Sequence, residues 1–227
     1  MQFTFYGHAC FSVNIGGKNI LFDPFIRPNE LAKNIDVSKI EADYIFISHG
    51  HEDHVADAKE LALQTGAILV SNYEIYTWFL AQGLKKLHPM NHGGTWDFDF
   101  GQVKMVNAVH SSTMPDGSTG GNPAGFVLTT EEGNFYYSGD TALTMDMKLI
   151  AMTCKDLDFC ILPIGDNFTM GVKDAILAAD FVSCDRVIGV HYDTFGFIKI
   201  DKEAAKIAFA KNGKELILVE IGETIEI

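Results

Sequence analysis

The chain has 227 residues, of which 17 are Lys or Arg and 30 are Asp or Glu, so its formal net charge is −13. This charge and the lack of any basic run disfavour nucleic acid as a partner, because phosphates are bound by clustered Lys and Arg. No apolar stretch reaches the length of a membrane span, and the N-terminus lacks the basic and apolar segments of a signal peptide. We therefore expect a cytoplasmic protein with no membrane partner, folded as a single domain over residues 1–227.

Strand signals dominate residues 1–25 and 95–138, whereas helical patterns fall near 54–64, 72–82, 141–153, 172–183 and 202–211. Residues 26–41 lack strong periodicity and are expected to form a loop with a short helix. Residues 111–123, rich in Gly and Ser, predict a second long loop. Loops of this length in compact domains are often functional, so we expect this one to act as a lid over the substrate.

The most informative segment is residues 49–54, which read His-Gly-His-Glu-Asp-His. It follows an apolar run at 42–48 that predicts a buried strand, and it precedes a helical pattern. His49 and His51, two residues apart on extended backbone, can converge on one metal ion. Asp53 and His54, at the start of the helix, point elsewhere and can serve a second ion. The alternative is a polar surface loop that happens to be rich in histidine.

Further candidate ligands stand at the ends of other predicted strands. Residues 103–109 run into His110, residues 134–138 lead to Asp140, and residues 186–190 end at His191. Rigid scaffolds often display functional side chains where a strand gives way to a loop. Taken alone, His110 or His191 would more often be a structural histidine. Together with the first motif, they favour a metal site.

This order of motifs resembles the metallo-β-lactamase superfamily of binuclear metallohydrolases over nearly the whole chain. The resemblance implies an α/β (α+β) fold, a four-layer αββα sandwich with the metals at one edge of the two sheets. It also implies two ligand sets joined by a bridging carboxylate. These are His49, His51 and His110 for the first metal, Asp53, His54 and His191 for the second, and Asp140 between them.

A narrower resemblance is carried by residues 7–9, 21–25, 120–126, 162–171 and 191–195. These segments are similar to a branch described only as metal-dependent hydrolases, which is related to the bacterial ascorbate-6-phosphate lactonases. The branch implies little about the substrate beyond a small molecule. The lactonase relatives suggest a homo-oligomer.

Several weaker candidates surround these ligands. Resemblance suggests that Asp23 accepts a hydrogen bond from a ligand imidazole, although an ordinary Asp-Pro turn is the alternative. His8 could line the site or donate to the substrate, or it could be structural. The remaining candidates are polar groups that could face the pocket or simply cap loops and turns, namely Thr141, Asn167, Thr169 and Thr194.

The donor set contains imidazoles and carboxylates but no thiolate, which favours zinc and remains compatible with manganese, iron or nickel. Two divalent ions would lower the pKa of a shared water toward about 7, and the resulting hydroxide would attack a small lactone, ester or phosphoester. Asp53 could bind a metal, orient that hydroxide and pass a proton to the leaving group. Two alternatives stay open: a phosphodiesterase or nuclease acting on short nucleotides, and a metal-dependent binding protein with little turnover.

Overall fold

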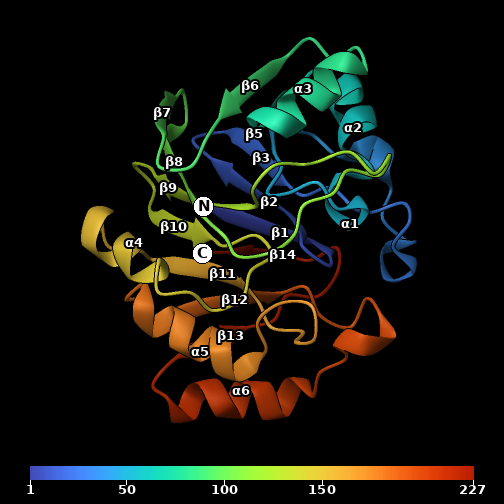
Figure 1. The fold of residues 1–227 in the computed structure, drawn as a ribbon. Coiled ribbons are helices and arrows are strands. Elements are labelled where there is room, and N and C mark those ends of the chain that lie inside the picture. The colour runs from blue at the N-terminus through green and yellow to red at the C-terminus, as the bar shows by residue number, and fades with distance from the viewer.

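Two seven-stranded sheets lie face to face in the computed structural model, which describes residues 1–227 (Figure 1). The first sheet has the order β14 (Thr224–Glu226), β1 (Gln2–Gly7), β2 (Cys10–Ile15), β3 (Lys18–Phe22), β4 (Tyr44–Phe46), β5 (Ile68–Asn72) and β6 (Leu87–Met90). The second has the order β13 (Glu215–Ile217), β12 (Arg186–Val190), β11 (Phe159–Pro163), β10 (Asn134–Tyr137), β9 (Ala124–Thr129), β8 (Gly101–Asn107) and β7 (Thr95–Phe98).

Each sheet combines an antiparallel part with a parallel part. In the first sheet β3, β4, β5 and β6 run parallel, and in the second sheet β10, β11, β12 and β13 do so. The carboxyl ends of parallel strands meet at one edge of a sheet, where ligand sites are common. The segments that follow β3, β4, β10 and β12 therefore leave the two sheets at edges where they can meet.

Three apolar clusters separate the four layers. One cluster of 24 buried residues fills the space between the sheets, and clusters of 19 and 18 lie between each sheet and its helices. Strand β11 shows how one strand contributes to two clusters. Phe159 and Ile161 belong to the central cluster, whereas Cys160 and Leu162 belong to an outer one, because successive side chains of a strand point to opposite faces.

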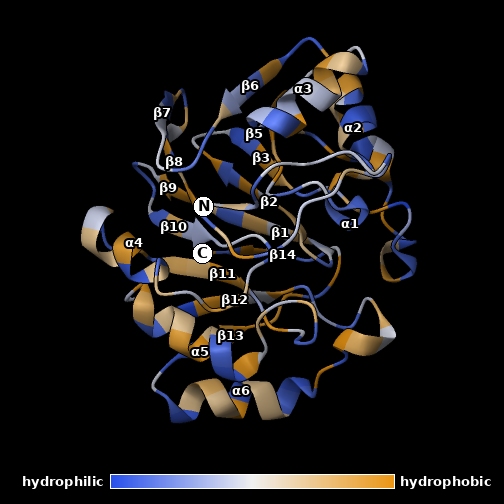
Figure 2. Cartoon of the chain, in the orientation of Figure 1, coloured by the Kyte–Doolittle hydropathy of each residue, from blue (hydrophilic) through white to orange (hydrophobic).

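The helices cover the outer faces of the sheets (Figure 1). Those on the first sheet are α1 (Glu52–Val55), α2 (Ala58–Thr65) and α3 (Tyr73–Ala81), and those on the second are α4 (Met147–Thr153), α5 (Val172–Phe181) and α6 (Lys202–Lys211). Short 3₁₀ turns occur at η1 (Glu30–Ala32), η2 (Val37–Lys39) and η3 (Gly196–Ile198). Figure 2 shows hydrophobic residues along the central strands and mixed faces on the helices. The predicted αββα sandwich is confirmed, and no helix is long and apolar enough to span a bilayer.

Two predicted elements have wrong boundaries. The strand predicted to reach Val109 ends at Asn107, and the helix predicted to start at residue 141 starts at Met147. Both differences have one cause. The amide of Val109 donates to Oγ1 of Thr141 at 2.9 Å, and the amide of Ala142 donates to the carbonyl of Val109 at 2.9 Å. These bonds hold the two segments side by side and leave neither free to extend its regular element.

The helix predicted over residues 54–64 is two helices, α1 and α2. The break comes at Asp57, whose carboxylate accepts from the amides of Ile26 and Arg27 at 2.6 and 2.9 Å. The predicted loop at 111–123 is held at its base, where the amide of Gly120 donates to the carbonyl of Ser112 at 2.9 Å. Its role as a lid stays a prediction.

Candidate metal site

The other six predicted ligands come together around the carboxylate of Asp140, which follows β10 and is 3% exposed. Its Oδ2 atom lies 2.9 Å from Nε2 of His191 and 3.3 Å from Nε2 of His54. The Nε2 atoms of His110 and His49 lie 3.7 and 3.9 Å from the same oxygen. One carboxylate therefore lies close to histidines from three separate segments of the chain.

Two groups of ligand atoms surround this carboxylate. In the first, the ligand atoms of His49, His51 and His110 lie within 4.8 Å of one another. In the second, Asp53, His54 and His191 meet the same criterion together with His8. The two groups match the two ligand sets that the resemblance implies, except that His8 joins the second.

Asp23 anchors the first motif from behind. Its carboxylate is fully buried and accepts from Nδ1 of His54 at 2.9 Å, from the amide of Ser48 at 2.7 Å and from the Ser48 hydroxyl at 2.5 Å. The Ser48 hydroxyl thus accepts in turn from Nδ1 of His49, 3.0 Å away. Tyr137, from the other sheet, donates a further bond to Asp23 at 2.6 Å.

These bonds determine which nitrogen of each imidazole carries the proton. When these rings are neutral, as metal binding requires, Nδ1 of His54 and of His49 donates and the Nε2 atom of each ring carries the lone pair; in His49 that atom lies 2.9 Å from Nδ1 of His51. In His54 this atom is buried and has no hydrogen-bond partner, an arrangement that costs free energy unless something binds it. A divalent metal ion would satisfy it. The residues present therefore fit a metal site.

Burial sets the charge of several rings. It lowers the pKa of His8 to about 4, and it also lowers the pKa values of His49, His51 and His110. These rings are neutral at neutral pH, the form that binds metals. Burial would also raise the pKa of the Asp140 carboxyl, but His191 and His54 outweigh it and hold that pKa well below its usual range. The carboxylate is therefore ionised.

Backbone geometry places two of these groups. Gly139, directly before Asp140, has a φ of +59°, and a Cβ there would lie 2.5 Å from the carbonyl oxygen of Ala124. His191 and His8 also have positive φ values, 56° and 57°, which are unfavourable for residues with a side chain. The amide of His191 donates to the carbonyl of His8 at 2.7 Å, so the two strained residues support each other.

His8 contacts a predicted ligand rather than solvent. Its Nε2 atom donates to Oδ2 of Asp53 at 3.0 Å, and its Nδ1 atom lies 2.9 Å from the hydroxyl of Thr194. Both ring nitrogens are thus occupied, which leaves His8 no free donor for a substrate. This geometry makes His8 a positioning residue for Asp53, with Thr194 holding its ring.

Replacing His8 with Gln should lower kcat about 10- to 100-fold while the metal content stays unchanged, the usual effect of losing a group that orients a ligand. Thr194→Val should give a smaller loss in the same direction, and Thr77→Val, on the surface of α3, should give none. The measurements are steady-state kinetics and elemental analysis of the same samples. Loss of one metal equivalent from the His8 variant would instead identify His8 as a ligand.

The other weaker candidates lie farther from the ligands' atoms. The hydroxyl of Thr141 accepts from the amide of Val109 and donates to the carbonyl of Ala142, so it caps the turn and does not bond Asp140. Asn167 is exposed, and Thr169 bonds only the carbonyl of Met170. Neither makes a hydrogen bond to a predicted ligand.

Sequence reasoning did not identify three contributing residues. Ser48 and Tyr137 complete the network around Asp23, and the hydroxyl of Ser111 lies 3.2 Å from Nε2 of His51. Ser48 and Ser111 each adjoin a predicted ligand in the sequence, which is the only available signal. Nothing in the sequence marks Tyr137, because its partner is 114 residues away.

Two facing sheets with a buried His and Asp cluster at their edge define a metal-binding protein of the αββα class. Residues 2–191 match the beta-lactamase superfamily domain, and the chain belongs to this family. It is 55% identical to a UPF0173 metal-dependent hydrolase of Christiangramia forsetii and 40% identical to the UPF0173 metal-dependent hydrolase YtkL of Bacillus subtilis, each over 100% of both chains. The protein is accordingly a metal-dependent hydrolase.

Solved structures agree with this assignment. Igni18, a metallo hydrolase from Ignicoccus hospitalis, superposes with a TM-score of 0.89 at 31% identity, covering 100% of this chain and 98% of the other. An isothiocyanate hydrolase from Delia radicum gut bacteria superposes with a TM-score of 0.80 at 17% identity, covering 100% and 99%. The second likeness shows the fold alone.

Proposed function

We propose that this protein is a binuclear hydrolase that acts on a small lactone, ester or phosphoester. The observation that supports the proposal is the position of Asp140, whose Oδ2 atom lies within 3.9 Å of ring nitrogens from both ligand groups. A carboxylate shared in this way suits a bridge between two ions. The donor set favours zinc, with manganese, iron and nickel as alternatives.

When bound, two divalent ions would lower the pKa of a shared water and polarise the substrate oxygen. The chain supplies the rest of the chemistry. Burial would raise the pKa of the Asp53 carboxyl, but His54 and His8 outweigh it and hold that pKa well below its usual range. Asp53 is 25% exposed, so an ionised carboxylate faces the open side of the site. There it can orient a water and pass its proton to a leaving group.

The predicted ligands differ in their exposure to solvent. His49, His54, Asp140 and His191 are buried, whereas His51, Asp53 and His110 are partly exposed. A substrate therefore meets the site along these three side chains. Burial of the others keeps bulk water away from the ligands that hold the ions.

Replacing His51 with Ala should reduce bound metal from two equivalents to about one and abolish hydrolysis, because the first group keeps only two ligands. The measurements are elemental analysis and a panel of lactones, carboxyl esters, phosphomonoesters and phosphodiesters. His88→Ala, a half-buried histidine against Trp96, should change neither result. Circular dichroism of the metal-free proteins checks that the fold is intact.

Chelator-sensitive turnover of one substrate class would support the proposal and name the bond that is cleaved. Fewer than one metal equivalent after reconstitution, with no hydrolysis of any substrate, would overturn it. Unchanged ligand binding by the His51 variant, without turnover in either protein, would favour a binding protein instead.

A further inference from the structure

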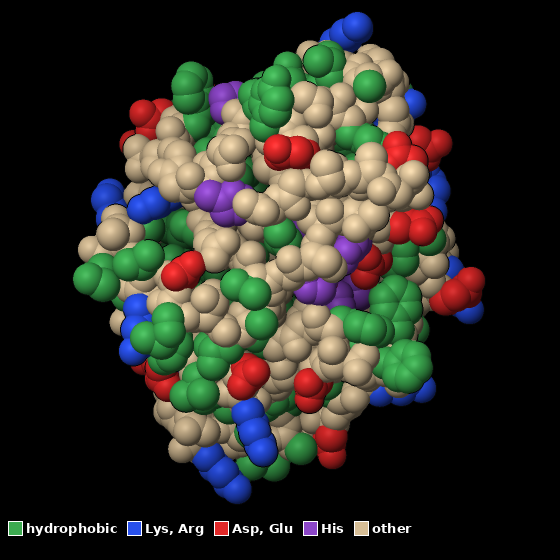
Figure 3. Space-filling model, viewed as in Figure 1, with side chains coloured by type: hydrophobic (Ala, Val, Ile, Leu, Met, Phe, Trp, Pro, Cys, Tyr) green, Lys and Arg blue, Asp and Glu red, His purple; other side chains and the backbone are tan.

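Three exposed phenylalanines lie near the open side of the metal site. Phe195, Phe168 and Phe197 are 37%, 50% and 78% exposed. Single exposed apolar side chains are common on proteins and need no explanation. Here, however, Figure 3 shows hydrophobic side chains gathered directly beside exposed histidine and acidic side chains, over the segment around residues 195–198. A group of this kind beside a reactive site indicates a binding surface.

The group is continuous with the predicted ligands. The ring of Phe195 lies 5.2 Å from the ring of His8. The ring of the buried Phe25 lies 5.6 Å from the same His8 ring and contacts it edge to face. His8 in turn bonds the carboxylate of Asp53. The apolar surface therefore begins one side chain away from the partly exposed carboxylate that faces the substrate.

Phe168 and Phe197 extend this surface outward, with their ring centroids 6.3 Å apart in an edge-to-face contact. Phe168 stands in a loop held near the site, because the amide of Met170 donates to the carbonyl of Thr141 at 3.0 Å. The loop backbone is strained, with φ values of 64° and 58° at Asp166 and Asn167. Its position is thus maintained against a cost in free energy.

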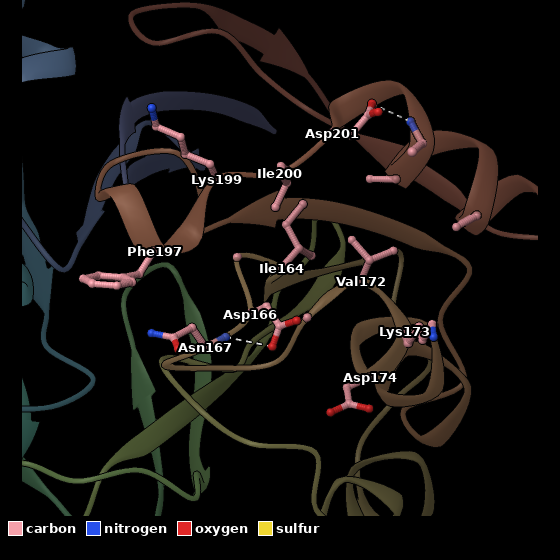
Figure 4. Close-up of a pocket in the computed structure, with 15 residues that line it drawn as sticks. Ile164, Asp166, Asn167, Val172, Lys173, Asp174, Phe197, Lys199, Ile200 and Asp201 are labelled. Atoms are coloured by element: carbon pink, nitrogen blue, oxygen red, sulfur yellow. Dashed lines mark hydrogen bonds between the residues drawn. The ribbon is translucent and has the colours of Figure 1, made fainter.

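Phe197 does not point into the neighbouring cavity. A cavity of about 770 Å³ lies between this loop and α6, and Phe197 is one of its lining residues. Figure 4 shows the ring of Phe197 turned away from Ile164 and Val172, which form the cavity's interior. We refer to Phe25, Phe168, Phe195 and Phe197 together as the aromatic wall.

No Lys or Arg side chain pairs with Asp53 or Asp140. Every ion pair of Asp53 and Asp140 is made with a histidine. Arg27, close in sequence to Phe25, pairs with Asp57, and Lys202, beyond η3, lies 3.8 Å from Asp193. Sites that recognise phosphate or carboxylate groups commonly use Arg or Lys as a clamp. Here no such clamp holds the acidic ligands, and phenyl rings lie beside them.

We propose that the aromatic wall binds the apolar part of an uncharged substrate. The substrate class is then a carboxylic ester or lactone that carries an aryl or alkyl group, and not a phosphoester. This inference rests on the proposed hydrolase function and narrows it. Ring-to-ring and ring-to-alkyl contacts give affinity in proportion to the apolar area removed from water.

Calorimetric titration of the zinc-loaded protein with 4-phenylbutyrate and with butyrate tests the wall without requiring turnover. The two probes share a carboxylate and differ by one phenyl group. The phenyl group should tighten binding about tenfold in the unmodified protein. In Phe197→Ser and Phe168→Ser this gain should fall at least threefold. Met152→Ser is the matched control, since Met152 is 77% exposed on α4, on the opposite side of the molecule in Figure 1. An equal gain in all four proteins would overturn the inference.

Hydrolysis of 4-nitrophenyl 4-phenylbutyrate, 4-nitrophenyl acetate and 4-nitrophenyl phosphate separates this inference from the hydrolase proposal. We expect kcat/KM to be highest for the phenylbutyrate ester, lower for the acetate ester and lowest for the phosphate. The preference for the phenylbutyrate ester over the acetate ester should be smaller in Phe197→Ser. Preference for the phosphate would overturn the inference and leave the binuclear hydrolase standing. No turnover at two metal equivalents would overturn the hydrolase proposal. If the protein is a dimer that Phe197→Ser converts to monomers in sedimentation, the wall is an interface between copies and the inference fails.

Discussion

Replacing Asp140 with Asn should remove one metal equivalent and lower kcat/KM by about a thousandfold or more, because a neutral amide cannot bridge two cations. The side chain keeps its size, so the change tests charge rather than packing. Elemental analysis gives the metal content, and steady-state kinetics on the best ester of the panel gives the rate. Asp146→Asn, at the exposed N-terminus of α4, is the matched control and should alter neither quantity.

The metal-free form of the Asp140 variant offers a second measurement. In the unmodified protein His54 has its pKa raised well above the ordinary value: burial would lower that pKa, but the carboxylates of Asp140, Asp53 and Asp23 outweigh it. A raised pKa stabilises the fold below the pKa of the unfolded state, and this stabilisation is lost as pH rises through the folded pKa. Asp140→Asn should reduce this pH-dependent stabilisation, because it removes one of the carboxylates that raise the pKa of His54. Two bound metals with full activity in this variant would contradict the bridging role.

Replacing Asp23 with Asn should destabilise the fold by about 3 kcal/mol, because its buried carboxylate accepts from four donors and an amide introduces N–H groups that face them. For a domain of this size the loss corresponds to a melting temperature lower by roughly 6–12 °C. Metal affinity should also weaken about 10- to 100-fold, since His54 and His49 lose the bonds that orient them. Thermal melting of the metal-free protein and chelator competition measure the two effects.

Asp57→Asn separates stability from metal binding. Asp57 is 2% exposed and accepts from two backbone amides and from Nη1 of Arg27 at 2.9 Å, but it bonds no predicted ligand. Its replacement should lower the melting temperature by a similar amount and leave metal affinity unchanged. If both variants weaken metal binding equally, Asp23 acts only through the stability of the fold.

Much of the architecture follows from local sequence patterns. The alternation along residues 103–109 and the apolar run before His49 predict strands, because the period of two is a property of extended backbone. The spacing within residues 49–54 predicts where the first ligand atoms lie relative to one another. Their positions at the ends of predicted strands make His110, Asp140 and His191 candidates, and the resemblance assigns each of them to a metal. The structure brings all seven side chains together, while their roles as ligands stay predictions.

Tertiary structure decided the contacts that support these groups. Asp23 and Tyr137 are 114 residues apart, and His8 and Thr194 are 186 apart, so no local pattern relates them. They meet because two sheets bury a common core and thereby bring the strand ends of both halves to one edge. The aromatic wall arises in the same way, from loops whose positions depend on packing against the whole domain. From its own residues, the sequence determined which potential metal-binding side chains the protein carries, and folding determined which other side chains contact them.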